Sequence, residues 1–128
     1  MEKKFEKDNT FFSGRYKSVG FAFNGAIKLI STEHSVMVQL CVLVVMVIAG
    51  FYFEISRIDW MFQVFAFGLV LSVEGLNTAI EKIADFIHPE FHKRIGFIKD
   101  IAAGAVFFAA MTAIAIGCLI YIPILFDL

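Results

Sequence analysis

A stripe of polar side chains crosses an otherwise apolar stretch of this sequence. Residues 69–90 read LVLSVEGLNTAIEKIADFIHPE, and Glu74, Asn77, Glu81 and Asp85 lie in or just beyond its apolar part. At about 100° per residue of helix, the four side chains fall within an arc of about 80° on one face. A carboxylate that faces lipid costs several kcal/mol, so this face is expected to line a protein interior or a water-filled cleft.

The chemistry of this stripe favours a hard metal ion and phosphate groups. Clustered carboxylates without cysteine or paired histidine ligands suit Mg²⁺ or Mn²⁺. Glu33, just before the first long apolar run, can add a ligand, and Lys99 can add a cation at the same level. These groups indicate a nucleotide-phosphate site without a known phosphate loop, because neither GxxxxGK[ST] nor GxGxxG occurs. Two alternatives stay open: a hydrogen-bond network that holds an oligomer together, and an oligomeric bundle that conducts cations or protons along the stripe.

The composition indicates a membrane protein. Of the 128 residues, 59% are hydrophobic and 16 are Phe, and the mean hydropathy is +0.80. A helix needs about 20 largely apolar residues to span a bilayer. We therefore predict one all-α membrane domain over residues 1–128, with transmembrane helices at 34–53, 58–87 and 99–126. The net charge of −1 provides no field that would attract nucleic acid.

A further helix is predicted at about residues 12–32. Its apolar residues are three or four apart and form one stripe, made of Phe12, Tyr16, Val19, Phe23, Ile27 and Ile30. Lys17, Asn24 and Lys28 fall on roughly the opposite face. This pattern is typical of an amphipathic helix that lies at the membrane interface, the alternative being a cap packed on the bundle.

The distribution of positive charge predicts the orientation of the spans, because lysine and arginine collect on the cytoplasmic side. The residues before the first span include Lys3, Lys4, Lys7, Arg15, Lys17 and Lys28. The end of the second span and the connection after it add Lys82, Lys93, Arg94 and Lys99, whereas the first connection has only Arg57. The N-terminus and the polar half of the second span are therefore expected on the cytoplasmic side. Tyr52, Trp60 and Tyr121 lie near the opposite boundary and indicate an aromatic belt.

Several motifs in order resemble a known family. Residues 73–106 read VEGLNTAIEKIADFIHPEFHKRIGFIKDIAAGAV, with the E-x-x-N-x-A-I-E core, the PEFH turn and the KD-x-AAGAV entry into the third span. They are similar to the signature of the prokaryotic diacylglycerol kinases and the closely similar undecaprenol kinases. The segment FAFNG and Glu33 also match, so the resemblance covers nearly the whole chain.

This resemblance implies a fold and an activity. The fold is a homotrimer in the bacterial cytoplasmic membrane, with three transmembrane helices and an N-terminal surface helix in each subunit and active sites between subunits. The reaction transfers the γ-phosphate of ATP to the hydroxyl of a lipid alcohol, with Mg²⁺ as the cofactor and the site on the cytoplasmic side.

The resemblance also implies roles for single residues. Glu74 matches the general base and Asn77 a residue that positions the reacting groups, and Glu33 and Glu81 match metal ligands. The expected nucleotide contacts are Glu33, Glu81, Glu90, His92, Lys99 and Asp100. The expected lipid-substrate contacts are Glu74, Asn77, Phe21 and Phe23, and Asp85 matches a polar position near the site.

The sequence departs from the family pattern at a few positions. Met37 stands where the family often has Arg, Gln39 where Glu or His is common, and Gly75 where a larger apolar residue is usual. The first two departures affect the contacts expected from the first span and leave the acidic core intact. The segments NTAIEK and KDIAAGAV look more like the undecaprenol kinase branch, so undecaprenol is the first expected substrate and diacylglycerol the second.

Overall fold

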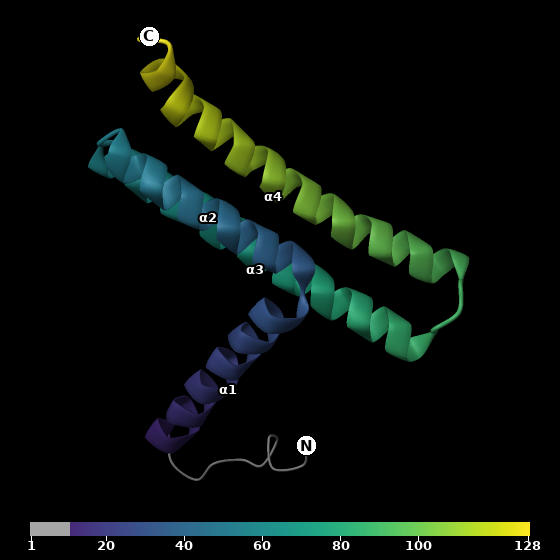
Figure 1. The fold of residues 1–128 in the computed structure, drawn as a ribbon. Coiled ribbons are helices and arrows are strands. Elements are labelled where there is room, and N and C mark those ends of the chain that lie inside the picture. Colours follow the sequence, from purple (N-terminus) through teal and green to yellow (C-terminus); the bar gives the residue numbers. More distant parts are fainter. Residues whose placement is uncertain (1–10) are drawn as a thin grey trace. The chain divides into compact units, whose positions relative to one another are not determined.

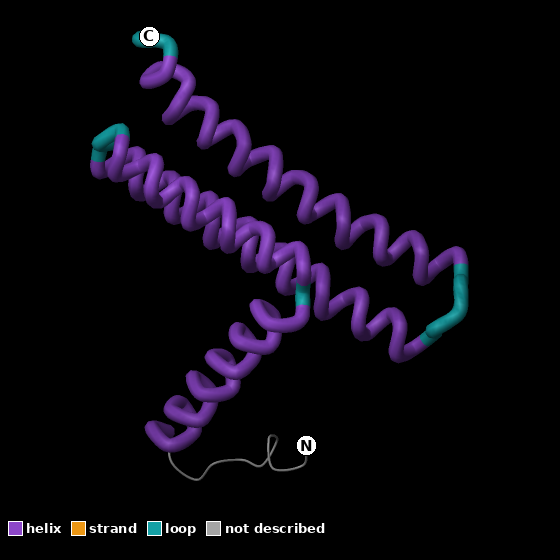
Figure 2. Tube along the Cα trace, in the orientation of Figure 1, coloured by secondary structure: helices purple, strands orange, loops and turns teal. Residues whose placement is uncertain are grey.

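The computed structural model describes residues 11–128, and in this range the chain is helical with short connections (Figures 1 and 2). The helices are α1 (Phe11–Thr32), α2 (His34–Tyr52), α3 (Arg57–Ile87) and α4 (Lys93–Leu125). Lys3, Lys4 and Lys7, whose charges contribute to the predicted orientation, lie outside the described residues. The chain divides into two compact units, one ending at Met37 and one comprising Val38–Leu128.

Helices α2, α3 and α4 are each long and apolar enough to cross a membrane. Helix α3 has 31 residues. At a rise of about 1.5 Å per residue it is about 46 Å long, so it exceeds a hydrocarbon core of about 30 Å. Its polar C-terminal part can therefore lie outside the hydrocarbon. Helix α4 begins at Lys93 rather than at the predicted residue 99, so half of the expected connection between the last two spans is helical.

Local interactions set where α3 and α4 begin and where α3 ends. Ser56 and Asp59 form a capping box, in which the Ser56 hydroxyl accepts a hydrogen bond from the Asp59 N–H at 3.1 Å. Helix α3 ends at Ile87, shortly before Pro89, because the residue before a proline disfavours helical geometry. The His92 side chain caps α4 by accepting from the Arg94 N–H at 3.1 Å.

In the second unit, α3 and α4 run antiparallel and side by side (Figure 1). One face of α3 is buried, and it comprises Gln63, Ala66, Val70, Glu74, Asn77 and Ala84. The buried residues of α4 include the small Ala102 and Ala109. Small residues allow helix backbones to approach closely where no hydrophobic effect drives association within the lipid.

Helices α2 and α3 approach each other closely near the short turn that joins them. A Cβ added to Gly50 would lie 2.6 Å from two ring carbons of Trp60, so this position excludes any larger residue unless the ring moves. The turn contains Glu54 with a φ of 51°, in the left-handed region. A small core of Ile55, Ile120 and Tyr121 packs beside this turn.

A buried polar network connects the three spanning helices near this core. The Tyr121 hydroxyl lies 2.7 Å from Gln63 Oε1 and donates to it, and Gln63 Nε2 donates to the Met46 carbonyl oxygen at 3.1 Å. The prediction that Tyr121 belongs to an aromatic belt is wrong, because its side chain is buried among these partners. Tyr52 is exposed and remains compatible with such a belt.

Helix α1 confirms the helix predicted at about residues 12–32, and none of its residues is buried. Its apolar stripe is exposed along its length, with Phe12 and Tyr16 more than four-fifths accessible, at 84% and 83%. An exposed apolar stripe of this kind suits a membrane interface, which stays a prediction for this helix.

Candidate active site

The buried face of α3 changes from apolar to polar at Glu74. Glu74 and Asn77 are only 8% and 9% exposed. They follow Gln63, Ala66 and Val70 on the same buried face of the helix. The prediction that the stripe turns away from lipid is therefore confirmed for these two residues. Farther along α3, Glu81 is half-buried and Asp85 is exposed, so the stripe runs from the protein interior to the surface.

A residue of α2 contacts the Glu74 carboxylate. Gln39 Nε2 donates a hydrogen bond to Glu74 Oε2 at 3.3 Å. The carbonyl oxygen of the same amide, Gln39 Oε1, is buried and has no hydrogen-bond partner within the described chain. One carboxylate oxygen of Glu74 is thus held by a neighbouring helix. The amide that holds it also has a carbonyl oxygen, Gln39 Oε1, that lacks a donor within the described chain.

The next two residues of the stripe contact each other. Asn77 Nδ2 donates to Glu81 Oε1 at 3.3 Å, and Asn77 Oδ1 is the other buried oxygen without a partner in the described residues. A buried acceptor without a donor is costly, and structures usually satisfy it with water, an ion or a ligand. The Glu74–Glu81 segment therefore has an excess of acceptors, which suits a cation or a hydroxyl donor.

Lys99 joins the polar stripe at its exposed end. Its Nζ lies 2.6 Å from Asp85 Oδ1, and this ion pair connects α4 to α3. Both residues were predicted to lie near one site, and the structure brings them together. At about 1.5 Å per residue, the eleven residues from Glu74 to Asp85 place this pair about 16 Å from Glu74 along the helix axis.

The remaining expected nucleotide contacts are exposed and lie around the connection between α3 and α4. No hydrogen bond or ion pair joins Glu90, His92 or Asp100 to the stripe within the described residues, and all three face solvent. His92 has a local role that the sequence analysis missed, since its Nδ1 caps α4. His88 Nδ1 lies 2.7 Å from the Glu90 carbonyl oxygen, and this contact helps to hold the connection.

Three expected site residues belong to the first unit. Glu33 lies between α1 and α2 and is half-buried, whereas Phe21 and Phe23 lie on α1 with exposed rings. The pairing of Glu33 with Glu81 as metal ligands stays a prediction, as does the contact of the two phenylalanines with the lipid.

The oxygen atoms of the stripe fit Mg²⁺ in kind. Within the described residues, no three or more His, Cys, Asp or Glu side chains gather as a ready metal site. Mg²⁺ does not require such a cage, because it is usually held by one or two carboxylates together with substrate phosphates and water. The Glu81 carboxylate and the unpartnered Asn77 Oδ1 are oxygen donors of the type that Mg²⁺ prefers.

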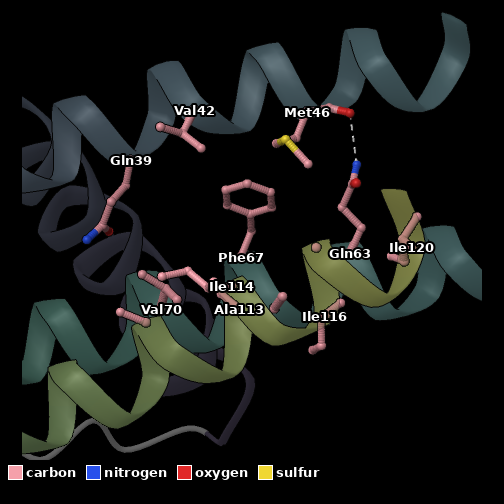
Figure 3. Close-up of a pocket in the computed structure, with 13 residues that line it drawn as sticks. Gln39, Val42, Met46, Gln63, Phe67, Val70, Ala113, Ile114, Ile116 and Ile120 are labelled. Carbon is pink, nitrogen blue, oxygen red and sulfur yellow. Dashed lines mark hydrogen bonds between the residues drawn. The ribbon is translucent and has the colours of Figure 1, made fainter. Parts of the chain in front are cut away.

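An apolar cavity lies near the Glu74 end of the stripe, because its lining includes Val70, one turn before Glu74, and Gln39, which donates to Glu74. It has a volume of about 420 Å³ and is lined by side chains of α2, α3 and α4 (Figure 3). Gln39 and Gln63 lie at its two ends in Figure 3, with Phe67 between them, and the rest of the lining is almost entirely apolar. Glu74 is therefore located where an apolar interior meets a polar helix face, an arrangement that suits the hydroxyl of a lipid.

Three polar residues of this face and its network, Gln63, Gln39 and Tyr121, were not predicted from the sequence to have these roles. Gln63 lies eleven residues before Glu74, about 20° away around the helix, so extending the stripe backwards would have found it. Gln39 was noted only as a departure from a family pattern, and nothing in the sequence indicated its hydrogen bond to Glu74. The position of Tyr121 near a helix end predicted an interfacial anchor rather than a buried hydrogen-bond donor.

Comparison with known proteins identifies the relatives of this chain. A family model described as prokaryotic diacylglycerol kinase matches residues 20–121. An undecaprenol kinase of Bacillus subtilis (strain 168) is 36% identical over 108 residues, which cover 84% of this chain and 88% of that protein. A diacylglycerol kinase of Escherichia coli (strain K12) is 26% identical over 113 residues, covering 88% of this chain and 93% of that protein.

The fold and the site define an integral-membrane protein with an acidic face at one end of its spans. The chain belongs to the prokaryotic diacylglycerol kinase family. The predicted resemblance, the all-α membrane fold class and the class of enzyme, a lipid kinase, are thereby confirmed. The alternative of a conducting bundle is not favoured.

Proposed function

We propose that this protein transfers the γ-phosphate of ATP to the hydroxyl of a membrane lipid alcohol and that Glu74 is the general base. The observation that supports this role best is the position of Glu74, whose buried carboxylate accepts a hydrogen bond from Gln39, a residue that lines the apolar cavity. A lipid alcohol has the matching shape, because its chain is apolar and its reacting hydroxyl is polar.

The proposed chemical step requires one proton transfer and one substitution at phosphorus. Glu74 takes the proton of the lipid hydroxyl, and the alcohol oxygen forms a bond to the γ-phosphorus while the bond from that phosphorus to the β-γ bridging oxygen breaks. ADP leaves with the electron pair of the broken bond. The proton on Glu74 then returns to solvent, and Asn77, one turn farther along α3, positions the reacting groups.

The phosphate-binding part of the site is proposed to lie farther along α3. Glu81, with the unpartnered Asn77 Oδ1 and with Glu33, would hold Mg²⁺, which neutralises phosphate charge when it is bound. Glu74 and Glu81 are about 10 Å apart along the helix axis. The Glu74 carboxylate can therefore act on the lipid hydroxyl while the Glu81 carboxylate holds the metal ion at the phosphates.

The nucleotide is proposed to extend from Glu81 towards the connection between α3 and α4. Lys99 would serve the phosphates as a cation, and Glu90, His92 and Asp100 would contact the nucleoside. Lys99 is already paired with Asp85, so Asp85 would orient it for this contact. His92 would use Nε2, because its Nδ1 caps α4.

The complete site is proposed to form between subunits of a homotrimer, on the cytoplasmic side of the membrane. In a single chain Glu81 is half-buried, and Asp85, Glu90 and Asp100 are exposed. The phosphate-binding part of the site is therefore open to contact with a neighbouring subunit. The lysines and arginines near the same ends of the spans support the cytoplasmic location.

Undecaprenol is the first proposed substrate and diacylglycerol the second. The B. subtilis undecaprenol kinase is 36% identical to this chain, and the E. coli diacylglycerol kinase is 26% identical over a similar length. Both lipids present a hydroxyl at the interface, so the mechanism is the same for either one.

Phosphate transfer from labelled Mg-ATP by the purified protein in mixed micelles tests the proposal. Undecaprenol and diacylglycerol are offered in parallel, and the labelled products are separated by chromatography. Strong labelling of one lipid would support the activity and identify the preferred acceptor. Absence of labelled lipid with folded protein, at millimolar Mg-ATP and with both lipids, would contradict it.

A further inference from the structure

The hydrogen bond between Gln39 and Glu74 has no part in the family roles described above. Within the described residues, Gln39 is the one side chain of another helix that hydrogen-bonds to the proposed base, at 3.3 Å from Nε2 to Oε2. It approaches from α2, whereas the rest of the polar stripe lies on α3. It also lines the apolar cavity, at the end opposite to Gln63 (Figure 3).

This contact fixes a side chain that the α3 backbone alone would leave free to rotate. A glutamate has three rotatable bonds, so its carboxylate can occupy several positions above the helix. A hydrogen bond from a second helix restricts it to one of these positions. It also occupies one carboxylate oxygen, Oε2, and leaves Oε1 for an incoming proton. Proton transfer needs the base within about 2.6–3.2 Å of the proton donor. Restricting the Glu74 carboxylate to one position near the lipid hydroxyl therefore raises the rate of proton transfer.

The orientation of the Gln39 amide follows from the chemistry of its partner. A carboxylate only accepts hydrogen bonds when it is ionised, so Gln39 must turn its NH₂ group towards Glu74. Its carbonyl oxygen is then the other polar atom of the amide, and this atom is buried without a partner in the described chain. A buried acceptor of this kind indicates that a donor arrives from outside the chain.

We propose that Gln39 is a positioning residue for lipid phosphorylation, which fixes Glu74 through its amide N–H and uses its carbonyl oxygen to receive the lipid hydroxyl beside that base. This inference rests on the proposed function, because the lipid hydroxyl is the donor that this function supplies. The hydroxyl proton is first held between the two acceptors and then passes to Glu74. Gln39 itself neither gains nor loses a proton.

The test compares two substitutions of Gln39 with a control substitution outside the cavity. Gln39→Met keeps an unbranched side chain of similar length and removes both polar groups of the amide. Tyr121→Phe is the stability control, because it removes a buried hydrogen bond to Gln63 at a residue that does not line this cavity and does not contact Glu74. Gln39→His restores an N–H donor at the first position. All three variants are assayed for kcat, for KM of Mg-ATP and of lipid, and for thermal stability in the same micelles.

The role proposed for Gln39 predicts that its substitution lowers kcat by more than the loss of thermal stability explains. A hydrogen bond to a charged group implies a loss of about 10- to 100-fold in kcat for Gln39→Met, with KM for Mg-ATP changed less than about twofold. Tyr121→Phe should lower the melting temperature while keeping kcat within about threefold of wild type. Gln39→His should recover most of the lost kcat.

Two results would overturn the inference. One is a Gln39→Met protein with near-wild-type kcat. The other is a loss of kcat that is equal in Gln39→Met and Tyr121→Phe and follows their melting temperatures, which would assign Gln39 to packing alone. A wild-type protein that labels neither lipid contradicts the proposed function as well. An active wild type with an active Gln39→Met variant contradicts only the role of Gln39.

Discussion

The substitution Glu74→Gln tests the central assignment most directly. It keeps the size of a side chain that is 8% exposed and removes its ability to take a proton. The amide oxygen of the new glutamine can still accept the hydrogen bond from Gln39, so the contact between α2 and α3 remains available. We therefore expect the free energy of unfolding to change by no more than about 1 kcal/mol.

The expected effect on catalysis is much larger. A positioned general base contributes about 10²- to 10⁴-fold to the rate, which corresponds to about 3–5 kcal/mol of transition-state stabilisation. Because Glu74 lies about 10 Å along α3 from Glu81, the binding of Mg-ATP should be nearly unaffected. The kcat of Glu74→Gln should thus fall by two to four orders of magnitude while KM for Mg-ATP stays close to the wild-type value.

The assay is phosphate transfer from labelled Mg-ATP in mixed micelles, with initial rates measured over a series of ATP and lipid concentrations. Glu54→Gln is the matched control, since it makes the same chemical change at an exposed residue of the turn between α2 and α3. Thermal unfolding with and without Mg-ATP shows whether each variant folds and binds nucleotide. If Glu74→Gln turned over as fast as Glu54→Gln, Glu74 could not be the general base.

Three further predictions concern other parts of the molecule. Glu81→Gln should raise KM for Mg-ATP by about tenfold with a smaller effect on kcat, because it removes one charge from the phosphate side; an unchanged KM would reject this role. Tyr121→Phe should lower the free energy of unfolding by about 1–3 kcal/mol, because it leaves a buried glutamine oxygen without its donor, and kcat should stay unchanged; equal melting temperatures would show that this hydrogen bond contributes nothing. Gly50→Ala should cost about 1–3 kcal/mol, because the new Cβ meets the Trp60 ring at 2.6 Å. Gly68→Ala, where nothing lies within 4 Å, is its control, and equal stability of the two variants would refute the close approach.

The amino-acid sequence determined the helical class, the spans and the direction of the acidic stripe. Long apolar runs have few structural solutions in a bilayer, because every backbone N–H and C=O must be satisfied within the segment. The spacing of Glu74 and Asn77 on a helix determines that they share a face, and the cost of charge in lipid determines that this face turns inward. The helix boundaries were predictable to within a few residues, apart from the earlier start of α4 at Lys93.

Only the tertiary structure decided which residues of other helices meet that face. The contacts of Gln39 with Glu74, of Lys99 with Asp85 and of Tyr121 with Gln63 join positions 14 to 58 residues apart. Such pairs depend on how two helices are rotated and shifted against each other, and this is set by packing of small residues rather than by the period of either helix. Periodicity assigns a residue to a face of its own helix, whereas its partner is known only when the helices are packed.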